Sequence, residues 1–273
     1  MAVEIEGPDP SSSMLAFFGS ELRRIRTEAG LRQCEAAKRA HTTQSMISKV
    51  EAARRVPSEE LSKDLDSAFG SGGHFTRLHP LVLRYAYPSW FLPYVELERE
   101  AISIRTFESQ VIPGLLQTED YARPLLAGAR PDHLDDLVAA RLSRQEILDA
   151  EERPRAWFVL DEQVLRRPIG GNAVMSRQLG RLLDAGREPR TVIQVVPERV
   201  TAHPGVEGAF TMLTLDDGPK VLYVDGFRKG RIELDASEVT EAAHAYDLLR
   251  AVALSHEDSA ELIGTYLKRY QDG

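Results

Sequence analysis

The fold of the first part of this chain is decided by the stretch GLRQCEAAKRAHTTQSMISKVE, which runs from Gly30 to Glu51. Its periodicity predicts one short helix over Gln33–Ala40, a tight break at His41-Thr42 and a second helix that begins after Thr43. The Thr43 hydroxyl is placed to cap this second helix, because it can accept a hydrogen bond from an amide of the first turn. Two short helices joined by so brief a turn must cross steeply, so the stretch predicts a helix-turn-helix.

The second helix of this motif divides into an apolar side and a polar side. Ile47 and Val50 are three residues apart and are predicted to point inward. The opposite side carries short or flexible polar residues near the start of the helix: Gln44, Ser45, Ser48 and Lys49. Such a side suits the major groove of double-stranded DNA. Glutamine can pair bidentately with adenine, serine can donate or accept, and lysine can reach guanine or phosphate.

Several short runs in and around the motif carry a family likeness: Leu22-Arg23-Arg24-Ile25-Arg26, Ala29-Gly30-Leu31-Arg32-Gln33, Thr43-Gln44-Ser45, Ile47-Ser48-Lys49-Val50-Glu51, Arg54-Arg55 and Pro57-Ser58. Together they resemble the helix-turn-helix of the phage-repressor-like family of transcriptional regulators, often called Xre-type. The resemblance implies that Gln33 clamps a phosphate. It also implies that Gln44, Ser45 and Lys49 read bases, and that Arg26 and Glu51 form an ion pair.

The sequence departs from that family at four positions in the motif. The family pattern usually has Leu, Leu, Gly and Val where this chain has Ala36, Ala40, His41 and Thr42. Smaller side chains bury less apolar surface, and each missing methylene removes about 0.8 kcal/mol of stabilisation. We therefore expect a loosely held DNA-binding unit.

The candidate DNA-binding residues are Gln33, Thr43, Gln44, Ser45, Ser48, Lys49, Arg54 and Arg55. The last two lie in the loop after the second helix, beside the expected DNA backbone. In the alternative interpretation these residues form a solvated surface, because glutamine and lysine are common on exposed helices and a short helix-turn-helix can serve interaction alone. The agreement between turn, cap, inward apolar positions and basic surroundings favours DNA binding.

The composition is that of an ordinary globular chain. Its 273 residues favour two domains, with 42% hydrophobic and 28% charged residues. No apolar run approaches the roughly 18 residues of a membrane helix, and Met1–Ser13 has no basic residue to suggest a signal peptide. Cys34 stands alone, so no internal disulfide can form. The sequence predicts a cytoplasmic, nucleoid-associated protein.

The charge is distributed unevenly along the chain. Residues 20–57 carry nine basic and four acidic side chains, which gives +5. Residues 1–19 carry −3, so that the remaining residues must carry −10 to reach the total of −8. A basic module joined to an acidic body is typical of a DNA-binding domain fused to a separate sensing or partner-binding domain.

The order of elements predicts an all-α helix-turn-helix domain followed by an α+β (mixed α/β) domain. The expected boundaries are a disordered tail over 1–13, the DNA-binding domain over 14–83, an aromatic-rich connector over 84–100 and the regulatory or partner-binding domain over 101–273. The connector contains Tyr85, Tyr87, Trp90, Phe91 and Tyr94. We interpret this cluster as a hydrophobic hinge between the domains, with an aromatic ligand cage as the alternative.

The periodicity predicts a helix over 14–28, another from 58 to 69, and alternating strands and helices in the second domain. Its strands are expected at 101–108, 155–161, 191–196, 209–215, 220–225 and 231–234. Its helices, with the one that leads into it, are expected at 94–100, 118–127, 131–151, 173–185, 235–254 and 255–269. Asp216-Asp217-Gly218-Pro219 predicts a hairpin turn.

A second set of runs lies between residues 95 and 270. It includes Phe107-Glu108, Val111-x-Pro113-Gly114-Leu115-Leu116-Gln117-Thr118-Glu119-Asp120-Tyr121-Ala122, Arg144-Gln145, Trp157-x3-Asp161-Glu162, Leu165-Arg166, Gly170-Gly171, Met175-x2-Gln178-Leu179, Gln194-Val195-Val196-Pro197, His203-Pro204-Gly205 and Gly208-x-Phe210. These runs resemble the C-terminal, antitoxin-like regulator domain of actinomycete WhiJ-like proteins. The resemblance implies a regulator of development or antibiotic production that acts beside a small protein encoded nearby. At Tyr223-Val224-Asp225 the chain departs from related sequences, which often have a glutamate there.

The sequence offers little for catalysis. His74 and His79 lie in a Gly-rich segment without further metal ligands, and no nucleotide-binding or nucleophile motif is present. Asp161-Glu162 and His203 form the one conceivable acid and base pair, although such residues more often cap helices and turns. We therefore expect no catalytic residue, no metal site, no cofactor and no enzymatic activity.

Two functional hypotheses follow. The first is a sequence-specific DNA-binding transcriptional regulator whose C-terminal domain receives a signal from a small protein partner or from a small-molecule ligand. It would act as a homodimer, because one module reads only a few base pairs. The second is an antitoxin-like interaction protein that mainly neutralises a small partner protein, with DNA binding secondary.

Overall fold

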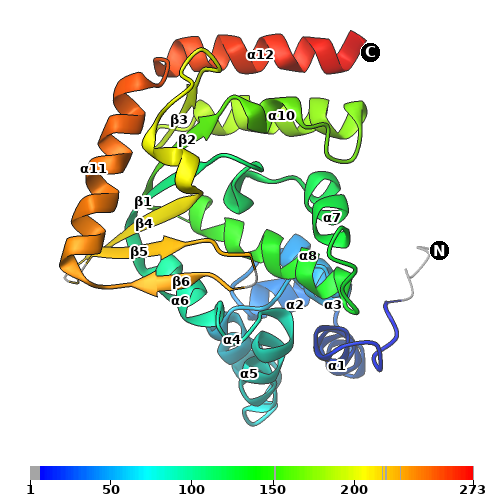
Figure 1. The fold of residues 1–273 in the computed structure, drawn as a ribbon. Helices are drawn as coiled ribbons and strands as arrows, with labels where there is room; N and C mark the ends of the chain where they lie inside the picture. Colours follow the sequence, from blue (N-terminus) through cyan, green and yellow to red (C-terminus); the bar gives the residue numbers. More distant parts are fainter. Residues whose placement is uncertain (1–6, 151, 217, 219, 228, 273) are drawn as a thin grey trace. The chain divides into compact units, whose positions relative to one another are not determined.

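The computed structural model describes residues 7–150, 152–216, 218, 220–227 and 229–272 (Figure 1). The chain forms two compact units. The first contains the described residues up to Leu92 together with Ala129–Ser143, and the second contains Pro93–Gly128 and the described residues from Arg144 onward. The first unit is helical and the second contains a sheet with helices, which confirms the predicted fold class.

The helices of the first unit are α1 (Met14–Glu28), α2 (Gln33–Arg39), α3 (Gln44–Glu51), α4 (Glu59–Phe69), α5 (His74–Ala86) and α8 (Leu134–Ser143). The first three coincide with the helices that the periodicity predicted. On α1 the inward positions Leu15, Phe18 and Leu22 are fully buried, as the spacing of three and four residues requires. Ser13 caps this helix by accepting a hydrogen bond from the amide of Ala16 at 3.1 Å.

A residue in the left-handed conformation follows the end of each of the helices α1 to α4 within two positions. These residues are Gly30, His41, Ala53 and Gly70, with φ of 67°, 48°, 53° and 63°. In α2 the amide of Thr42 then donates back to the carbonyl of Ala37 at 2.9 Å, which closes the last turn. Glycine adopts this conformation without steric penalty, whereas His41 and Ala53 do not. The family pattern has glycine where His41 stands, so this departure introduces backbone strain that the sequence analysis did not predict.

Two helices of the first unit differ from the sequence-based expectation. Helix α5 occupies residues for which the sequence analysis predicted no helix, and it contains Pro80 in its interior. Its first turn is capped by Asp66, whose carboxylate accepts hydrogen bonds at 2.9 Å from the amides of Phe75 and Thr76. Burial alone would raise the pKa of Asp66, but these bonds and the hydroxyls of Ser71 and Thr76 outweigh it and lower the pKa.

Helix α8 is shorter than the expected helix over 131–151, and it packs within the first unit, not the second. Its buried residues Val138, Ala139 and Ala140 join the helical core. The chain turns into a 3-10 helix, Arg144–Leu148, where the α-helical pattern was expected to continue. The structure therefore differs from the expected division at residues 83 and 101. Its first unit also includes the later segment Ala129–Ser143.

The described part of the second unit is built on a six-stranded mixed sheet with the strand order β3-β2-β1-β4-β5-β6. The strands are β1 (Ala101–Glu108), β2 (Arg155–Asp161), β3 (Thr191–Val196), β4 (Phe210–Leu215), β5 (Lys220–Val224) and β6 (Arg231–Glu233). Strands β1, β2 and β3 are parallel, with Phe107 opposite Val159. Strand β4 returns antiparallel to β1 and begins an antiparallel meander that ends at β6.

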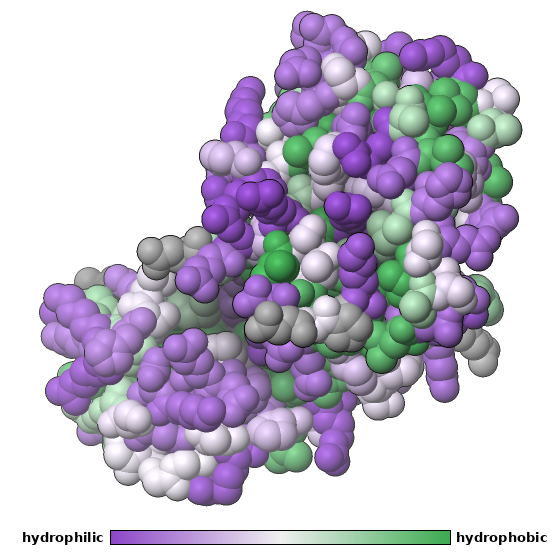
Figure 2. All heavy atoms as spheres, turned by 90° about the vertical axis from the view of Figure 1, so that its left-hand side faces the viewer, coloured by the Kyte–Doolittle hydropathy of each residue, from purple (hydrophilic) through white to green (hydrophobic). Residues whose placement is uncertain are grey.

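The second unit contains the helices α6 (Leu92–Glu100), α7 (Glu119–Ala127), α9 (Gln163–Arg166), α10 (Asn172–Gly186), α11 (Ala236–Val252) and α12 (His256–Asp272), and the 3-10 helices Gly114–Leu116, Arg144–Leu148 and Pro204–Glu207. Helix α11 covers one face of the sheet, and its Tyr246 hydroxyl donates to the carbonyl of Trp157 at 2.7 Å (Figure 1). Leu248 and Val252 of α11 are exposed. On the face shown in Figure 2, hydrophobic residues lie among hydrophilic ones.

The predicted strands of the second domain are all present within one or two residues of their expected ends. The predicted hairpin turn includes Asp217 and Pro219, which lie outside the described residues, and so do the first six residues of the expected tail. The described remainder of that tail includes a turn in which the amide of Ser12 donates to the carbonyl of Asp9.

The left-handed residues His41 and Ala53 generate a stability prediction. His41→Gly and Ala53→Gly should each raise the free energy of unfolding by about 1 kcal/mol, because glycine relieves the left-handed strain but loses some of this gain to chain entropy. Urea denaturation of the full chain measures this. The control is Ala52→Gly, one residue earlier, where φ is −90°. Stabilisation by the control equal to that of Ala53→Gly would contradict the explanation.

Candidate nucleic-acid interface

The outer side of α3 is polar and exposed. The residues Thr43, Gln44, Ser45, Ser48 and Lys49 are all exposed, whereas Ile47 and Val50 on the opposite side have no accessible surface. Thr43 caps the helix by accepting a hydrogen bond at 3.1 Å from the amide of Met46. The capped helix therefore presents four polar side chains to solvent: Gln44, Ser45, Ser48 and Lys49.

A buried carboxylate fixes α3 to the rest of the motif. Glu51, at the end of α3, is 2% exposed and accepts hydrogen bonds from Arg26 through Nε at 2.5 Å and through Nη2 at 3.0 Å. The third guanidinium nitrogen of Arg26 donates to the carbonyl of Leu31 at 2.7 Å. The expected ion pair between Arg26 and Glu51 is present, and its bidentate geometry sets the angle between α1 and α3.

Gln33 belongs to the same cluster. Its Nε2 donates to Oε2 of Glu51 at 2.9 Å, so the side chain that the family resemblance assigns to phosphate binding is anchored at the start of α2. Gln33 is only half-buried. An amide nitrogen carries two hydrogens, so the same group retains a donor for a phosphate oxygen.

Close approach between α1 and α3 depends on Gly19, which the sequence analysis did not single out. A Cβ at this position would lie 2.4 Å from the carbonyl oxygen of Val50, a distance no side chain tolerates. Gly19 lies inside α1, where glycine is otherwise unfavourable. A helix-interior glycine that faces the apolar side is the sequence signal that identifies such a contact.

The two arginines of the following loop differ from each other. Arg54 is exposed, whereas Arg55 is half-buried and donates through Nη1 to the carbonyl of Leu142 on α8. Next to it, the amide of Val56 donates to the hydroxyl of Ser143 at 2.8 Å. The structure thus leaves Arg54 facing solvent with the α3 residues and turns Arg55 toward α8.

Further exposed basic side chains lie on α2 and at its start: Arg32, Lys38 and Arg39. Arg32 is paired with Glu35 at 3.1 Å. This hydrogen bond raises the pKa of Arg32, whose guanidinium is charged at physiological pH in any case. Together with Lys49 and Arg54 these groups give the motif a positive surface, as its charge of +5 over residues 20–57 requires.

The residues considered for catalysis lie in the second unit. The structure brings His203 and Asp161 together, with Nε2 of His203 3.2 Å from Oδ2 of Asp161. The other oxygen of Asp161 accepts from the amide of Gln163 at 2.8 Å and so forms a local turn just before the short helix α9. Glu162 also accepts hydrogen bonds from neighbouring elements, from the Tyr266 hydroxyl and the Glu198 amide. Within the described residues no group of three or more His, Cys, Asp or Glu side chains is placed to hold a metal ion.

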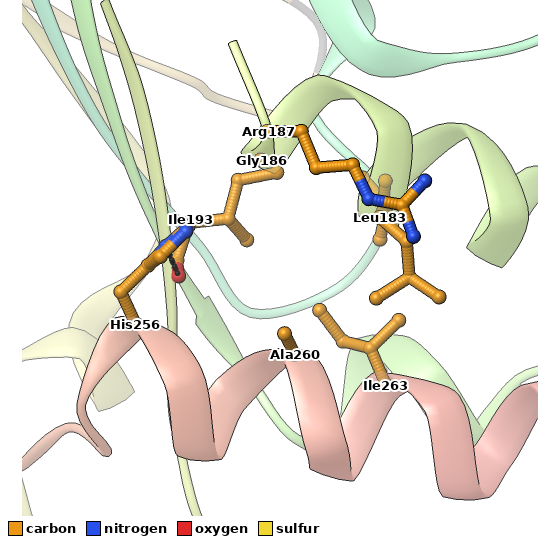
Figure 3. Close-up of a pocket in the computed structure, with 8 residues that line it drawn as sticks. Leu183, Gly186, Arg187, Ile193, His256, Ala260 and Ile263 are labelled. Atoms are coloured by element: carbon orange, nitrogen blue, oxygen red, sulfur yellow. Dashed lines mark hydrogen bonds between the residues drawn. The ribbon is translucent and has the colours of Figure 1, made fainter. Parts of the chain in front are cut away.

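A cavity of about 100 Å³ lies between α10, β3 and α12 (Figure 3). Leu183, Ile193 and Ile263 contribute apolar walls, while Arg187 and His256 stand at its edges. The carbonyl of Ile193 is 3.2 Å from Nδ1 of His256. The cavity is smaller than the roughly 300–1,000 Å³ of sites that enclose drug-sized ligands.

The fold and the exposed polar face of α3 define the class: a helix-turn-helix protein. Comparison with known families agrees with this, since residues 18–77 match the family described as Helix-turn-helix domain. Residues 91–265, more than half of the chain, match the family described as Domain of unknown function (DUF5753). The chain belongs to this DUF5753 family. No curated protein and no solved structure matches the chain significantly.

The helix-turn-helix domain supports a DNA-binding regulator and a DNA partner. In the described part of the chain, none of the helices combines the length and the apolar character needed to cross a membrane.

The buried pair predicts an asymmetric response to mutation. Glu51→Gln should lower the free energy of unfolding by about 3–5 kcal/mol, because it leaves the buried charge of Arg26 unpaired. The double variant Arg26→Met/Glu51→Leu should lose less than Glu51→Gln alone, since it removes both charges. Urea denaturation measures the three proteins. A double variant less stable than Glu51→Gln would contradict the assignment.

Proposed function

We propose that this protein is a sequence-specific DNA-binding transcriptional regulator whose second unit receives a signal from a small protein partner or a small-molecule ligand. The observation that carries the proposal is the division of α3, on which Gln44, Ser45, Ser48 and Lys49 are exposed while Ile47 and Val50 are buried. A solvated surface alone does not require a capped helix whose orientation is fixed by a buried ion pair.

The dimensions of α3 fit the role. Eight residues rise about 12 Å along the helix axis, and the major groove of B-DNA is about 12 Å wide. In this proposal Gln44 at the start of the helix pairs with adenine, Ser45 and Ser48 donate or accept, and Lys49 reaches guanine. Gln33 and Arg54 bind phosphates, which position the protein without reading sequence.

Electrostatics supports the same orientation. The motif is positive, whereas the remainder of the chain beyond residue 57 carries −10. Phosphates attract the first and repel the second, so the protein should approach DNA with α3 forward. Binding should weaken steeply with salt, because each neutralised phosphate lowers log K by about 0.9 per decade of salt concentration.

The finer parts of the proposal rest on the family resemblances of the sequence. A homodimer is proposed because one short helix reads few base pairs, and two copies would read half-sites about 34 Å apart. The likeness to WhiJ-like regulators supports a role in development or antibiotic production and a small partner protein encoded nearby. We propose no enzymatic activity, and we place the protein in the cytoplasm with the nucleoid.

The alternative is an antitoxin-like interaction protein in which DNA binding is secondary. The left-handed conformations of His41 and Ala53 favour it, because they weaken the helix-turn-helix on both sides of the recognition helix. Measuring DNA binding to the protein's own upstream region with and without the neighbouring small protein separates the two functions. A regulator binds that DNA specifically, by itself or with its partner, whereas the interaction protein binds the partner tightly and the DNA only weakly.

Variants of α3 test the proposed function. Gln44→Ala should weaken binding to the best duplex selected from random sequence by about tenfold, since one bidentate base contact contributes roughly 1–3 kcal/mol of discrimination. Lys49→Ala should weaken binding as well, and fluorescence anisotropy measures both. The control is Lys268→Ala, an exposed lysine of α12. Selection that enriches no sequence, or α3 variants that bind like the control, would rule out the proposed function.

A further inference from the structure

Helix α8 is held in the first unit by hydrogen bonds along its length. Near its start, Oδ1 of Asp136 accepts from the hydroxyl of Ser13, the capping residue of α1, at 2.8 Å. Near its end, the carbonyl of Ala140 accepts from the hydroxyl of Tyr87, which follows α5, at 3.0 Å. The helix is therefore hydrogen-bonded both to the residue that precedes α1 and to the residue that follows α5.

The last turn of α8 binds the loop that follows the recognition helix. The final carbonyls of an α-helix lack intrahelical partners and carry a partial negative charge. Here the carbonyl of Leu142 accepts from the guanidinium of Arg55, and the hydroxyl of Ser143 accepts from the amide of Val56 at 2.8 Å. The same hydroxyl donates to the carbonyl of Ala139 at 2.7 Å, which fixes its orientation. Both partners lie within five residues of Glu51, where α3 ends.

The residue after Ser143 is anchored in the second unit. Arg144 donates to the buried Glu98 of α6 through Nε and through Nη2, each at 2.7 Å. The hydroxyl of Tyr94 donates to the same carboxylate at 2.9 Å. A bidentate pair of this kind is rigid. One peptide bond thus separates the residue that holds the loop after α3 from the residue that is fixed in the second unit.

We propose that α8 is a positioning element for DNA reading, which transmits the state of the second unit to the loop after the recognition helix. Ser143 and Tyr87 are positioning residues in this scheme, because they act through the loop and through α8 and not on DNA. The Glu98–Arg144 pair holds the residue that directly follows α8 in the chain. A signal that displaces this pair shifts Ser143, releases the amide of Val56 and moves Arg54 relative to α3.

This inference rests on the proposed function and deepens it by naming how the same site is regulated. It also explains why a segment from the middle of the DUF5753 match, Ala129–Ser143, belongs to the helical unit. A plain linker between two independent units would need no hydrogen bonds to the loop after α3.

The first test uses Ser143→Ala in the full chain. Amide hydrogen exchange, followed by mass spectrometry on a peptide over residues 52–58, should become faster, because the amide of Val56 loses its acceptor. Affinity for the duplex selected with the wild-type protein should fall by about three- to tenfold, as loss of one part-buried hydrogen bond allows. The matched control is Ser67→Ala, because the hydroxyl of Ser67 on α4 also donates to the carbonyl four residues earlier.

The second test asks whether a change in the second unit alters the loop after α3. Glu98→Gln keeps the shape of the side chain and removes its charge, and Glu96→Gln makes the same change at an exposed position of α6. Only Glu98→Gln should speed exchange over residues 52–58 and weaken DNA binding. Thermal unfolding of both variants checks whether each is folded. If Glu98→Gln abolishes folding, Tyr94→Phe removes one hydrogen bond to the same carboxylate and takes its place.

The outcomes separate the two proposals. Faster exchange in Ser143→Ala with DNA affinity equal to that of Ser67→Ala would show that α8 is only a structural support, and would overturn the inference. Unchanged exchange in Glu98→Gln would overturn the transmission between units. If the wild-type protein selects no DNA sequence, the proposed function fails, while exchange over residues 52–58 still decides whether Glu98 acts on this loop.

Discussion

The helix-turn-helix depends on one buried carboxylate, that of Glu51. Short helices are marginally stable in water, so α2 and α3 need tertiary contacts to hold their crossing angle. Glu51 supplies them by accepting hydrogen bonds from Arg26 on α1 and Gln33 on α2. Burying a charge is unfavourable unless every partner is in place, which makes this arrangement specific as well as stable. The polar face of α3 is oriented by this cluster and not by α3 alone.

The second unit is organised around its mixed sheet. Three parallel strands and an antiparallel meander meet at β1, which pairs with β2 on one side and β4 on the other. The core includes Phe107 of β1, Val159 of β2 and Tyr246 of α11, which ties the sheet to its covering helix. Close packing near Phe107 explains a glycine of the sequence, since a Cβ at Gly205 would lie 2.2 Å from that ring.

Much of this architecture could be predicted from the sequence, because apolar periodicity and capping residues are local. The exposed face of α3, the cap at Thr43 and the strands follow from such signals. The departures have non-local causes. Helix α5 was missed because its start is capped by Asp66, eight residues before it, and the Gly-rich turn hides the continuity. The place of α8 could not be foreseen, because Tyr87, Arg55 and Val56 lie 53 to 87 residues from their partners. The same separation explains why Arg55 was grouped with Arg54.

The chain crosses between the two units at Leu92-Pro93, Gly128-Ala129 and Ser143-Arg144. A fragment that stops at residue 92 would lack α8, which packs against α5. A fragment that starts at residue 93 would contain α8 without the helices of the first unit against which it packs. Neither unit can be excised, or recombined with that of a relative, as one uninterrupted piece of gene. During synthesis on the ribosome, moreover, the first unit is completed only after the 36 residues Pro93–Gly128 of the other unit have been made.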